Sequence, residues 1–212
     1  MISLANSIIN LIKTKNALFL VLVAFLIQIF YLVTLSKIDN PASNTLYFLK
    51  GDGFQYINYC ENLYNYGTYF EGSEHVINNY NSRMPGMCVL YLPLRLFFDK
   101  HTTLTLFVII QALLAAIASY VLAKSAYKII KSEFSFYAVF SIYASSLYVA
   151  NYNHRLYSES LALSAIIFAF YFFIETMESK KTVHVFLMSL FIIWAVFLRP
   201  FLAPLIILVG LL

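Results

Sequence analysis

Charged residues are scarce in this chain of 212 residues, since only 11% are Asp, Glu, Lys or Arg, against roughly 25% in an average soluble domain. Hydrophobic residues make up 61%, and a soluble fold would need an implausibly large apolar core to bury them. The formal net charge of +4 is small and the lysines are dispersed, which argues against a nucleic acid as partner. The composition therefore predicts an integral membrane protein.

Cysteine is scarcer still, with only Cys60 and Cys88 in the chain. Neither has metal-ligand spacing to another Cys or His, so the sequence supports no zinc site. Both fall in segments that the topology below places outside the cytoplasm, where a disulfide is chemically permitted.

Long apolar runs dominate what is present. A membrane-spanning helix needs about 20 apolar residues, fewer if neighbouring helices help, and the runs that qualify or nearly do cover residues 17–35, 102–123, 134–150, 160–174, 184–198 and 201–212. The first run is too long for a signal-peptide core and lacks a cleavage site, so we expect a retained anchor. The last run is cut by the end of the chain, which suggests a protein truncated at its C-terminus.

We therefore predict an all-α multi-pass membrane protein with about six transmembrane helices. Residues 1–212 would form one N-terminal transmembrane module. It would contain a first span at 17–35, an outer loop at 36–101 with interfacial helices, and further spans at 102–212.

The orientation follows from lysine and arginine in the short connecting segments. Lysines precede the first span, and others lie in the segment between the second and third spans and in the segment between the fourth and fifth spans. These segments and the N-terminus are therefore expected in the cytoplasm. All four arginines fall on the opposite side: Arg83, Arg95, Arg155 and Arg199. Arginine matches phosphate with a planar fork, so an anionic ligand is expected there, the alternative being separate contacts with lipid headgroups. The bias toward Asn, Ile, Lys and Tyr suggests a bacterium with AT-rich coding. We therefore expect the protein in a bacterial inner membrane.

The outer loop contains two predicted interfacial helices. Apolar residues recur at helical spacing over 54–66, which predicts an amphipathic helix that ends at Gly67. Residues 71–82 are polar and turn-like. Pro85 and Gly86 then open a second apolar stretch, 87–98, which is too short to span and is interrupted by a proline.

Two acids are candidates for chemistry. Asp52 stands between Gly51 and Gly53, which allow tight turns and let a bulky substrate approach the carboxylate. Its alternative role is a helix N-cap. Glu159 enters the fourth span, where an ionisable residue is costly and usually functional, although a helix-start acid favoured by the helix dipole is the alternative.

Cations near these acids predict an anion site. Arg83 stands just before Pro85, and Arg199 stands directly before Pro200, an arrangement suited to an anion at a helix N-terminus. The alternative for both is that they only mark where a helix ends at the membrane boundary. His154, beside Arg155, could hold a phosphate or transfer a proton, or could be a solvated loop histidine.

Four features follow one another along the chain: an acid early in a long outer loop, an Arg-x-Pro-Gly segment, a Ser-Glu-Ser entry to the fourth span and a Leu-Arg-Pro segment after the fifth. In this order they resemble the N-terminal module of GT-C glycosyltransferases. The likeness is to protein O-mannosyltransferase and aminoarabinose transferase type enzymes. Relatives often carry a Lys-Gly-Pro type motif where Leu198, Arg199 and Pro200 stand here.

This resemblance implies inverting transfer of a sugar from a polyprenyl-phosphate-linked donor to a glycan, lipid or protein acceptor on the non-cytoplasmic side. Asp52 matches the general base and Glu159 the second acid. The donor phosphate would meet Arg83, Arg155, Arg199 and His154. No cofactor is required, and a divalent metal is compatible with the superfamily. A transporter or flippase of a lipid-linked glycan, or a noncatalytic membrane scaffold, are the alternatives.

Overall fold

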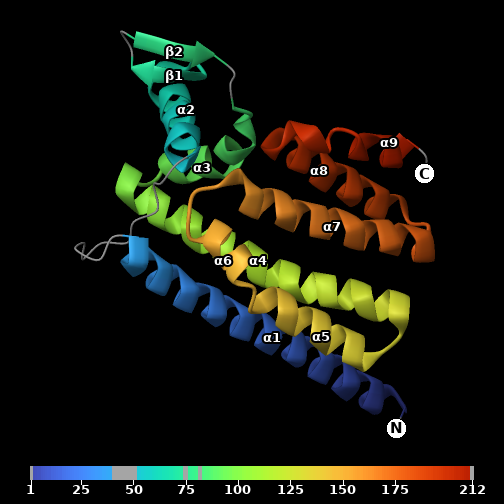
Figure 1. The fold of residues 1–212 in the computed structure, drawn as a ribbon. Coiled ribbons are helices and arrows are strands. Elements are labelled where there is room, and N and C mark those ends of the chain that lie inside the picture. The colour runs from blue at the N-terminus through green and yellow to red at the C-terminus, as the bar shows by residue number, and fades with distance from the viewer. Residues whose placement is uncertain (1, 40–51, 74–75, 81–82, 211–212) are drawn as a thin grey trace.

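A computed structural model describes residues 2–39, 52–73, 76–80 and 83–210 of the chain. Its four longest elements are the helices α1 (Ile2–Asp39), α4 (Lys100–Ile130), α7 (Ser158–Ser179) and α8 (Thr182–Leu198). They run side by side along a common direction (Figure 1). The predicted all-α architecture is confirmed.

Polar residues at the ends of the apolar runs set where the helices begin and end. Asp99 caps α4, because its side chain accepts hydrogen bonds from the backbone amides of His101 and Thr102. Lys131 ends α4 and Lys180 ends α7 in the left-handed conformation, with φ of 59° and 53°. At both points the chain reverses its direction, so that the next helix packs back along the one before it.

Three described helices are long and apolar enough to cross a membrane, over residues Asn16–Ile38, Lys100–Ile130 and Ser158–Ser179. Helix α8 is also apolar but has only 17 residues. Large apolar side chains on α1 face outward, as at Leu18 and Phe30, which are 73% and 66% exposed. In water such a surface would be unstable, and it fits contact with lipid.

The third predicted run is a broken helix rather than one continuous span. It divides into α5 (Glu133–Ala144) and α6 (Leu147–Asn153). Helix α1 satisfies carbonyl groups at the break, since Gln28 Nε2 donates to Ala144 O at 3.2 Å and Tyr31 OH donates to Ser145 O at 3.2 Å. Non-helical backbone at membrane depth is tolerated where neighbouring helices satisfy it in this way.

The sixth predicted run is also interrupted. It forms a short 3-10 turn, η2 (Pro200–Leu202), followed by α9 (Leu205–Gly210) within the described residues. Proline at the first position of η2 fits a helix start, because proline lacks the amide hydrogen that such a position leaves unused.

The predicted outer loop folds into α2 (Asp52–Tyr66), a hairpin of β1 (Phe70–Ser73) and β2 (Val76–Tyr80), a 3-10 turn η1 (Pro85–Met87) and α3 (Cys88–Arg95). Gly67 ends α2 with a φ of 68°, as predicted. The antiparallel hairpin replaces the expected turn-like segment and carries a bulge between Glu71 and Gly72. We did not predict any strand.

Two asparagines of α2 fasten the hairpin. Asn58 Oδ1 accepts from the amide of Gly72 at 2.9 Å, and Asn62 Nδ2 donates to Phe70 O at 2.9 Å and Gly72 O at 3.1 Å. Asn62 is buried. Side-chain amides of α2 therefore satisfy backbone groups of β1 that would otherwise need a further strand as partner.

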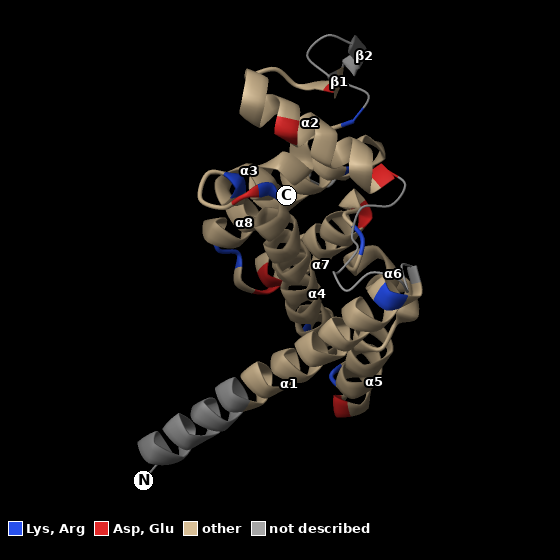
Figure 2. Ribbon diagram, turned by 90° about the vertical axis from the view of Figure 1, so that its left-hand side faces the viewer, with Lys and Arg blue, Asp and Glu red and all other residues tan. Residues whose placement is uncertain are grey.

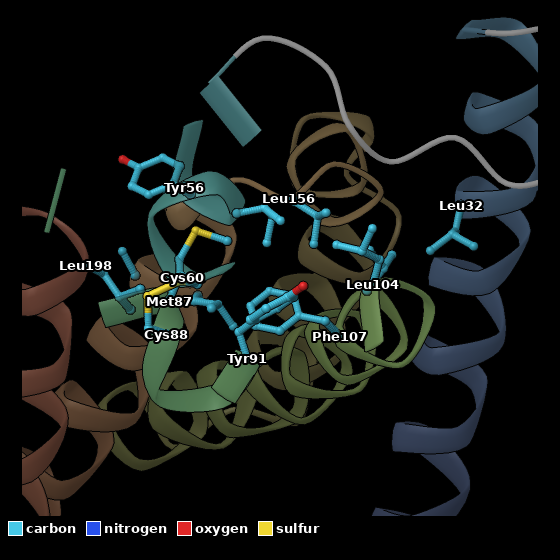
Figure 3. Close-up of a cluster of buried hydrophobic side chains, with 14 residues drawn as sticks. Leu32, Tyr56, Cys60, Met87, Cys88, Tyr91, Leu104, Phe107, Leu156 and Leu198 are labelled. Atoms are coloured by element: carbon cyan, nitrogen blue, oxygen red, sulfur yellow. A yellow bond between two sulfur atoms is a disulfide. The ribbon is translucent and has the colours of Figure 1, made fainter. Parts of the chain in front are cut away.

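The buried core of this loop contains a disulfide between Cys60 of α2 and Cys88 of α3, with the Cα atoms 5.3 Å apart. Figure 3 shows it among buried side chains that include Tyr91 and Phe107 on one side and Leu198 on the other. The pairing that the sequence left open is therefore formed. It joins α2 to α3, and the surrounding core joins both to α4, α7 and α8.

Charges sort to the ends of the bundle. The middle stretches of α1 and α4 are free of charged residues (Figure 2). In Figure 1, the N-terminus and the α4–α5 and α7–α8 turns lie at one end, while α2, α3, the α6–α7 turn and η2 lie at the other. We call this second end the loop end. All four arginines belong to its segments, and the lysine-rich segments named above belong to the opposite end.

Candidate active site

Asp52 opens α2 and forms an ion pair with Arg83, whose Nη2 lies 3.0 Å from Asp52 Oδ2. Gln55, one turn along α2, holds the same guanidinium, because its Oε1 accepts from Arg83 Nε at 3.0 Å and from Nη2 at 2.5 Å. The Asp52 side chain is 54% exposed and that of Arg83 is 25% exposed. Asp52 is thus a carboxylate of fixed direction that remains open to solvent. Gly51, its predicted flank, lies outside the described residues.

Glu159 lies in the first turn of α7 and forms a second ion pair, with Arg199. Arg199 is the extended residue between α8 and η2, so the pair joins the start of one helix to the end of the next. Glu159 is half-exposed and Arg199 is more buried. The Nε of Arg199 is buried and has no hydrogen-bond partner among the residues that the structure describes.

The N-terminal part of α2 rests on the start of α7 and brings the two ion pairs to the same end of the bundle. The hydroxyl of Tyr56 accepts a hydrogen bond from Ser158 Oγ at 3.0 Å. Gly53 lies so close to the turn before α7 that an added Cβ would be 3.0 Å from Leu156 O. A larger residue at position 53 would push α2 away from this turn.

His154 and Arg155 lie in the turn between α6 and α7, and they differ in exposure. His154 caps α6 through its backbone amide, which donates to Ala150 O at 3.0 Å, and is only 1% exposed. The alternative of a solvated loop histidine is therefore wrong. Arg155 is half-buried, and its predicted contact with the donor phosphate stays a prediction.

A ladder of three tyrosines borders Glu159. The ring centres of Tyr148 and Tyr152 are 4.8 Å apart, and those of Tyr152 and Tyr157 are 5.8 Å apart. Tyr148 is 68% exposed. A small hollow of about 30 Å³ lies between Tyr148, Tyr152 and Glu159, so an acid and two tyrosines, of which Tyr148 is exposed, line the same hollow.

Buried polar groups hold α6 and α7 in register beneath this hollow. Asn153 Nδ2 donates to Gln28 Oε1 at 2.8 Å, and the hydroxyl of Ser160 donates to Asn153 Oδ1. All three side chains are buried. A fully connected polar network of this kind rigidifies the structure around it, here the segment that carries Glu159.

A second fastening lies between α2 and α3, beside the disulfide. The hydroxyl of Tyr91 donates to Glu61 Oε1 at 2.5 Å, and Arg95 Nε donates to the same oxygen at 2.8 Å. Burial, reinforced by the hydrogen bond to Glu61, raises the pKa of Tyr91 well above its ordinary value. The hydrogen bond to Glu61 likewise raises the pKa of Arg95. The fourth outer arginine thus has a structural partner.

The fit of a divalent metal depends on oxygen and nitrogen ligands gathered at one point. Asp52 and Glu159 each face an arginine, and no group of three or more His, Cys, Asp or Glu side chains gathers in the described part of the chain. These described residues therefore do not form a set of metal ligands, and a divalent metal stays a prediction.

The residues that connect the predicted ones were not recognised from the sequence. Gln55 and Tyr56 belong to the predicted amphipathic helix and Ser158 to the Ser-Glu-Ser segment, but none of them was a site candidate. One signal could have found them, because charged groups near a membrane boundary need partners and polar residues next to an expected acid are the nearest ones.

Comparison with known proteins gives the family. The model of the Alg9-like mannosyltransferase family matches residues 75–212, which include Arg83, His154, Arg155, Glu159 and Arg199 but not Asp52. No curated protein and no solved structure matches the chain. The predicted resemblance to GT-C glycosyltransferases is confirmed. The chain belongs to the Alg9-like mannosyltransferase family and is a membrane glycosyltransferase of the GT-C type.

Proposed function

We propose that this chain transfers a sugar from a polyprenyl-phosphate-linked donor to a hydroxyl of an acceptor, with inversion at the anomeric carbon and Asp52 as general base. One observation supports this proposal best. Two acid–arginine pairs, Asp52 with Arg83 and Glu159 with Arg199, lie at the loop end of a glycosyltransferase bundle and are connected through Tyr56 and Ser158.

In the proposed step, a lone pair of the acceptor oxygen attacks the anomeric carbon. The bond from that carbon to the phosphate oxygen breaks, and its electron pair stays on the phosphate. The proton of the acceptor hydroxyl passes to Asp52, whose carboxylate is fixed by Arg83 and half-exposed. General-base assistance of this kind contributes about 10²–10⁴-fold in rate.

The leaving phosphate needs positive charge, and Arg199 is the best placed residue to supply it. Its buried Nε has no hydrogen-bond partner among the described residues, and a buried donor without a partner costs free energy that a ligand would recover. Glu159 aligns the rest of the guanidinium. Arg83 and Arg155 are further candidates on the same side, and His154 would need to become accessible first.

An apolar groove next to Arg199 suits the lipid part of the donor. It has a volume of about 380 Å³ and lies between α3 and α8, lined by residues that include Val89, Leu90, Trp194 and Phe197. Phe197 precedes Arg199 by two residues. A polyprenyl chain in this groove would bring its phosphate toward the guanidinium of Arg199.

Tyrosine faces next to Glu159 suit a sugar ring. The hollow that Glu159 lines has room for about one water molecule, so a sugar would lie on the exposed ring of Tyr148 beside it. Aromatic rings with a polar tip suit a surface that is apolar on one side and wet on the other. The description of the family makes mannose the first sugar to test. The acceptor is a glycan, a lipid or a protein.

The lysines support our proposal for the side of the membrane on which the site lies. Lys124, Lys128, Lys180 and Lys181 belong to segments at the end opposite the candidate site. The rule that cytoplasmic segments are rich in Lys and Arg then places the N-terminus in the cytoplasm and the site outside it. We propose a bacterial inner membrane.

The membership in a glycosyltransferase family favours this enzyme over a flippase or a scaffold. The proposal is tested with membranes that contain the full-length protein and with polyprenyl-phosphate mannose labelled at the anomeric carbon. We expect transfer to endogenous acceptors, release of polyprenyl phosphate and inversion of the anomeric configuration, read by NMR of the product. Retention of configuration, or activity only with a nucleotide sugar, would contradict the proposal.

A further inference from the structure

The two acid–arginine pairs stand on different parts of the chain. Asp52 and Arg83 belong to α2 and the segment before η1, whereas Glu159 and Arg199 belong to the start of α7 and the end of α8. Chemistry that uses both pairs needs a fixed distance between them. We propose that Tyr56 is a positioning residue that sets this distance, through its ring toward Arg83 and its hydroxyl toward Ser158.

The ring of Tyr56 supports the first pair. The guanidinium carbon of Arg83 lies 5.2 Å from the centre of this ring, within the range of a cation–π interaction. Tyr56 is only 3% exposed, and little water competes with such a contact when it is buried. The ring and Gln55 together hold the guanidinium of Arg83 in place, with its Nη2 directed toward Asp52.

The hydroxyl of Tyr56 reaches the second pair. Ser158 Oγ donates to this hydroxyl at 3.0 Å, and Ser158 is completely buried. Ser158 is the first residue of α7 and stands directly before Glu159, whose Oε2 is 3.5 Å from the same Ser158 Oγ. One side chain of α2 thus connects Arg83 to Ser158, the neighbour of the second acid.

The other fastenings of α2 lead elsewhere. The disulfide and the contacts of Glu61 tie α2 to α3, and the asparagine contacts tie it to β1. The close approach of Gly53 to Leu156, and the core that Ile57 shares with Leu161, also pack α2 against the start of α7. Such packing has little direction, whereas the hydrogen bond between Tyr56 and Ser158 fixes two atoms relative to each other, so we assign the precise position of α2 relative to α7 to this contact.

This inference rests on the proposed function, and it predicts a particular kinetic signature. Tyr56→Phe removes the hydroxyl and keeps the ring against Arg83. Because misplacement of about 1 Å costs up to about 10²-fold in rate, we expect kcat to fall at least about tenfold, with little change in the KM for the donor. Ser158→Ala removes the same hydrogen bond from the other side, so its loss of kcat should be similar.

The decisive experiment is a double-mutant cycle on the full-length protein in membranes, with polyprenyl-phosphate mannose as the probe. Tyr56→Phe, Ser158→Ala and the double variant should lose kcat to the same extent, because all three break one hydrogen bond. Unchanged kcat in either single variant, or losses that multiply in the double variant, would overturn the inference. If Tyr56→Phe fails to accumulate, Ser158→Ala alone still tests it, since unchanged kcat there would overturn it.

A matched control separates positioning from folding. Tyr91→Phe also removes a buried hydroxyl from this region, but that hydroxyl fastens α3 to α2 through Glu61. We expect this control to lower the melting temperature and to keep kcat. An equal loss of kcat in Tyr91→Phe would overturn the inference in favour of a general structural effect. Failure of the proposed function is seen separately, as full activity in Asp52→Asn.

Discussion

Arg83 Nη2 lies 3.0 Å from Asp52 Oδ2, so these two charges of the outer loop form one unit. Asp52 is more than half exposed, and an ion pair of this kind contributes at most about 1 kcal/mol to stability. The pair therefore matters for the direction of the carboxylate rather than for folding. Substitution of Asp52 should then change activity without unfolding the protein.

Replacement of Arg199 by lysine should weaken donor binding. Lysine keeps the charge but loses the planar fork that contacts phosphate and carboxylate together. We expect the KM for polyprenyl-phosphate mannose to rise about tenfold in Arg199→Lys, which corresponds to about 1.4 kcal/mol. Lys100→Gln, which removes an exposed cation from the start of α4, serves as the control and should leave KM unchanged. An unchanged KM in Arg199→Lys would instead favour contact with lipid headgroups.

Loss of the disulfide should destabilise the loop end. Cys60 and Cys88 are 28 residues apart in sequence, and closing such a loop typically stabilises a protein by about 2–4 kcal/mol. We expect the double variant Cys60→Ala, Cys88→Ala to melt at a lower temperature than the wild-type protein. Dithiothreitol should lower the melting temperature of the wild-type protein and leave the double variant unaffected. Equal melting temperatures would show that the disulfide contributes nothing.

Stability should fall in alkaline solution because of Tyr91. Burial and the hydrogen bond to Glu61 raise the pKa of Tyr91 in the folded protein, whereas the tyrosine side chain has a pKa of about 10 in the unfolded chain. The stabilisation is therefore complete below that pH and is lost as the pH rises toward the folded pKa. The wild-type melting temperature should fall more steeply than that of Tyr91→Phe between about pH 9 and about pH 11. Parallel curves would contradict this assignment.

Gly86 should not tolerate a side chain. A Cβ added there would lie 2.5 Å from Phe197 O and 2.6 Å from Leu198 N, both of which are backbone atoms of α8. We expect Gly86→Ala to separate η1 from α8 at a cost of about 1–3 kcal/mol. Gly67→Asn is the control, because nothing lies near Gly67 and asparagine accepts its left-handed backbone. Wild-type stability in Gly86→Ala would contradict the close packing.

The spacing of apolar residues, and the residues that end helices, explain what the sequence could predict. The helical spacing of 54–66 and Gly67 after it predicted α2 to within two residues at its start. The apolar runs predicted α4, α7 and α8 in the same way. These features depend on residues close in the chain, where spacing alone decides the outcome.

The features that the sequence did not reveal depend on distant partners. The break between α5 and α6 contains neither Gly nor Pro, and Gln28 satisfies its carbonyl group from 116 residues away. The hairpin depends on Asn58 and Asn62 of the preceding helix rather than on alternating strand residues. The acids and arginines were found one by one, but the pairing of Asp52 with Arg83 depends on how the loop returns to α2, and that of Glu159 with Arg199 on how α8 packs along α7.

Asp52 tests the central claim most directly. Asp52→Asn keeps the shape of the side chain and removes the base, so transfer from polyprenyl-phosphate mannose should fall about 10²–10⁴-fold at an unchanged melting temperature. Asp99→Asn is the matched control, because Asp99 is an exposed acid of the same loop that caps α4 and asparagine caps equally well. That control should transfer sugar at the wild-type rate. Wild-type transfer in Asp52→Asn would contradict the account, because Asp52 would then not be the base.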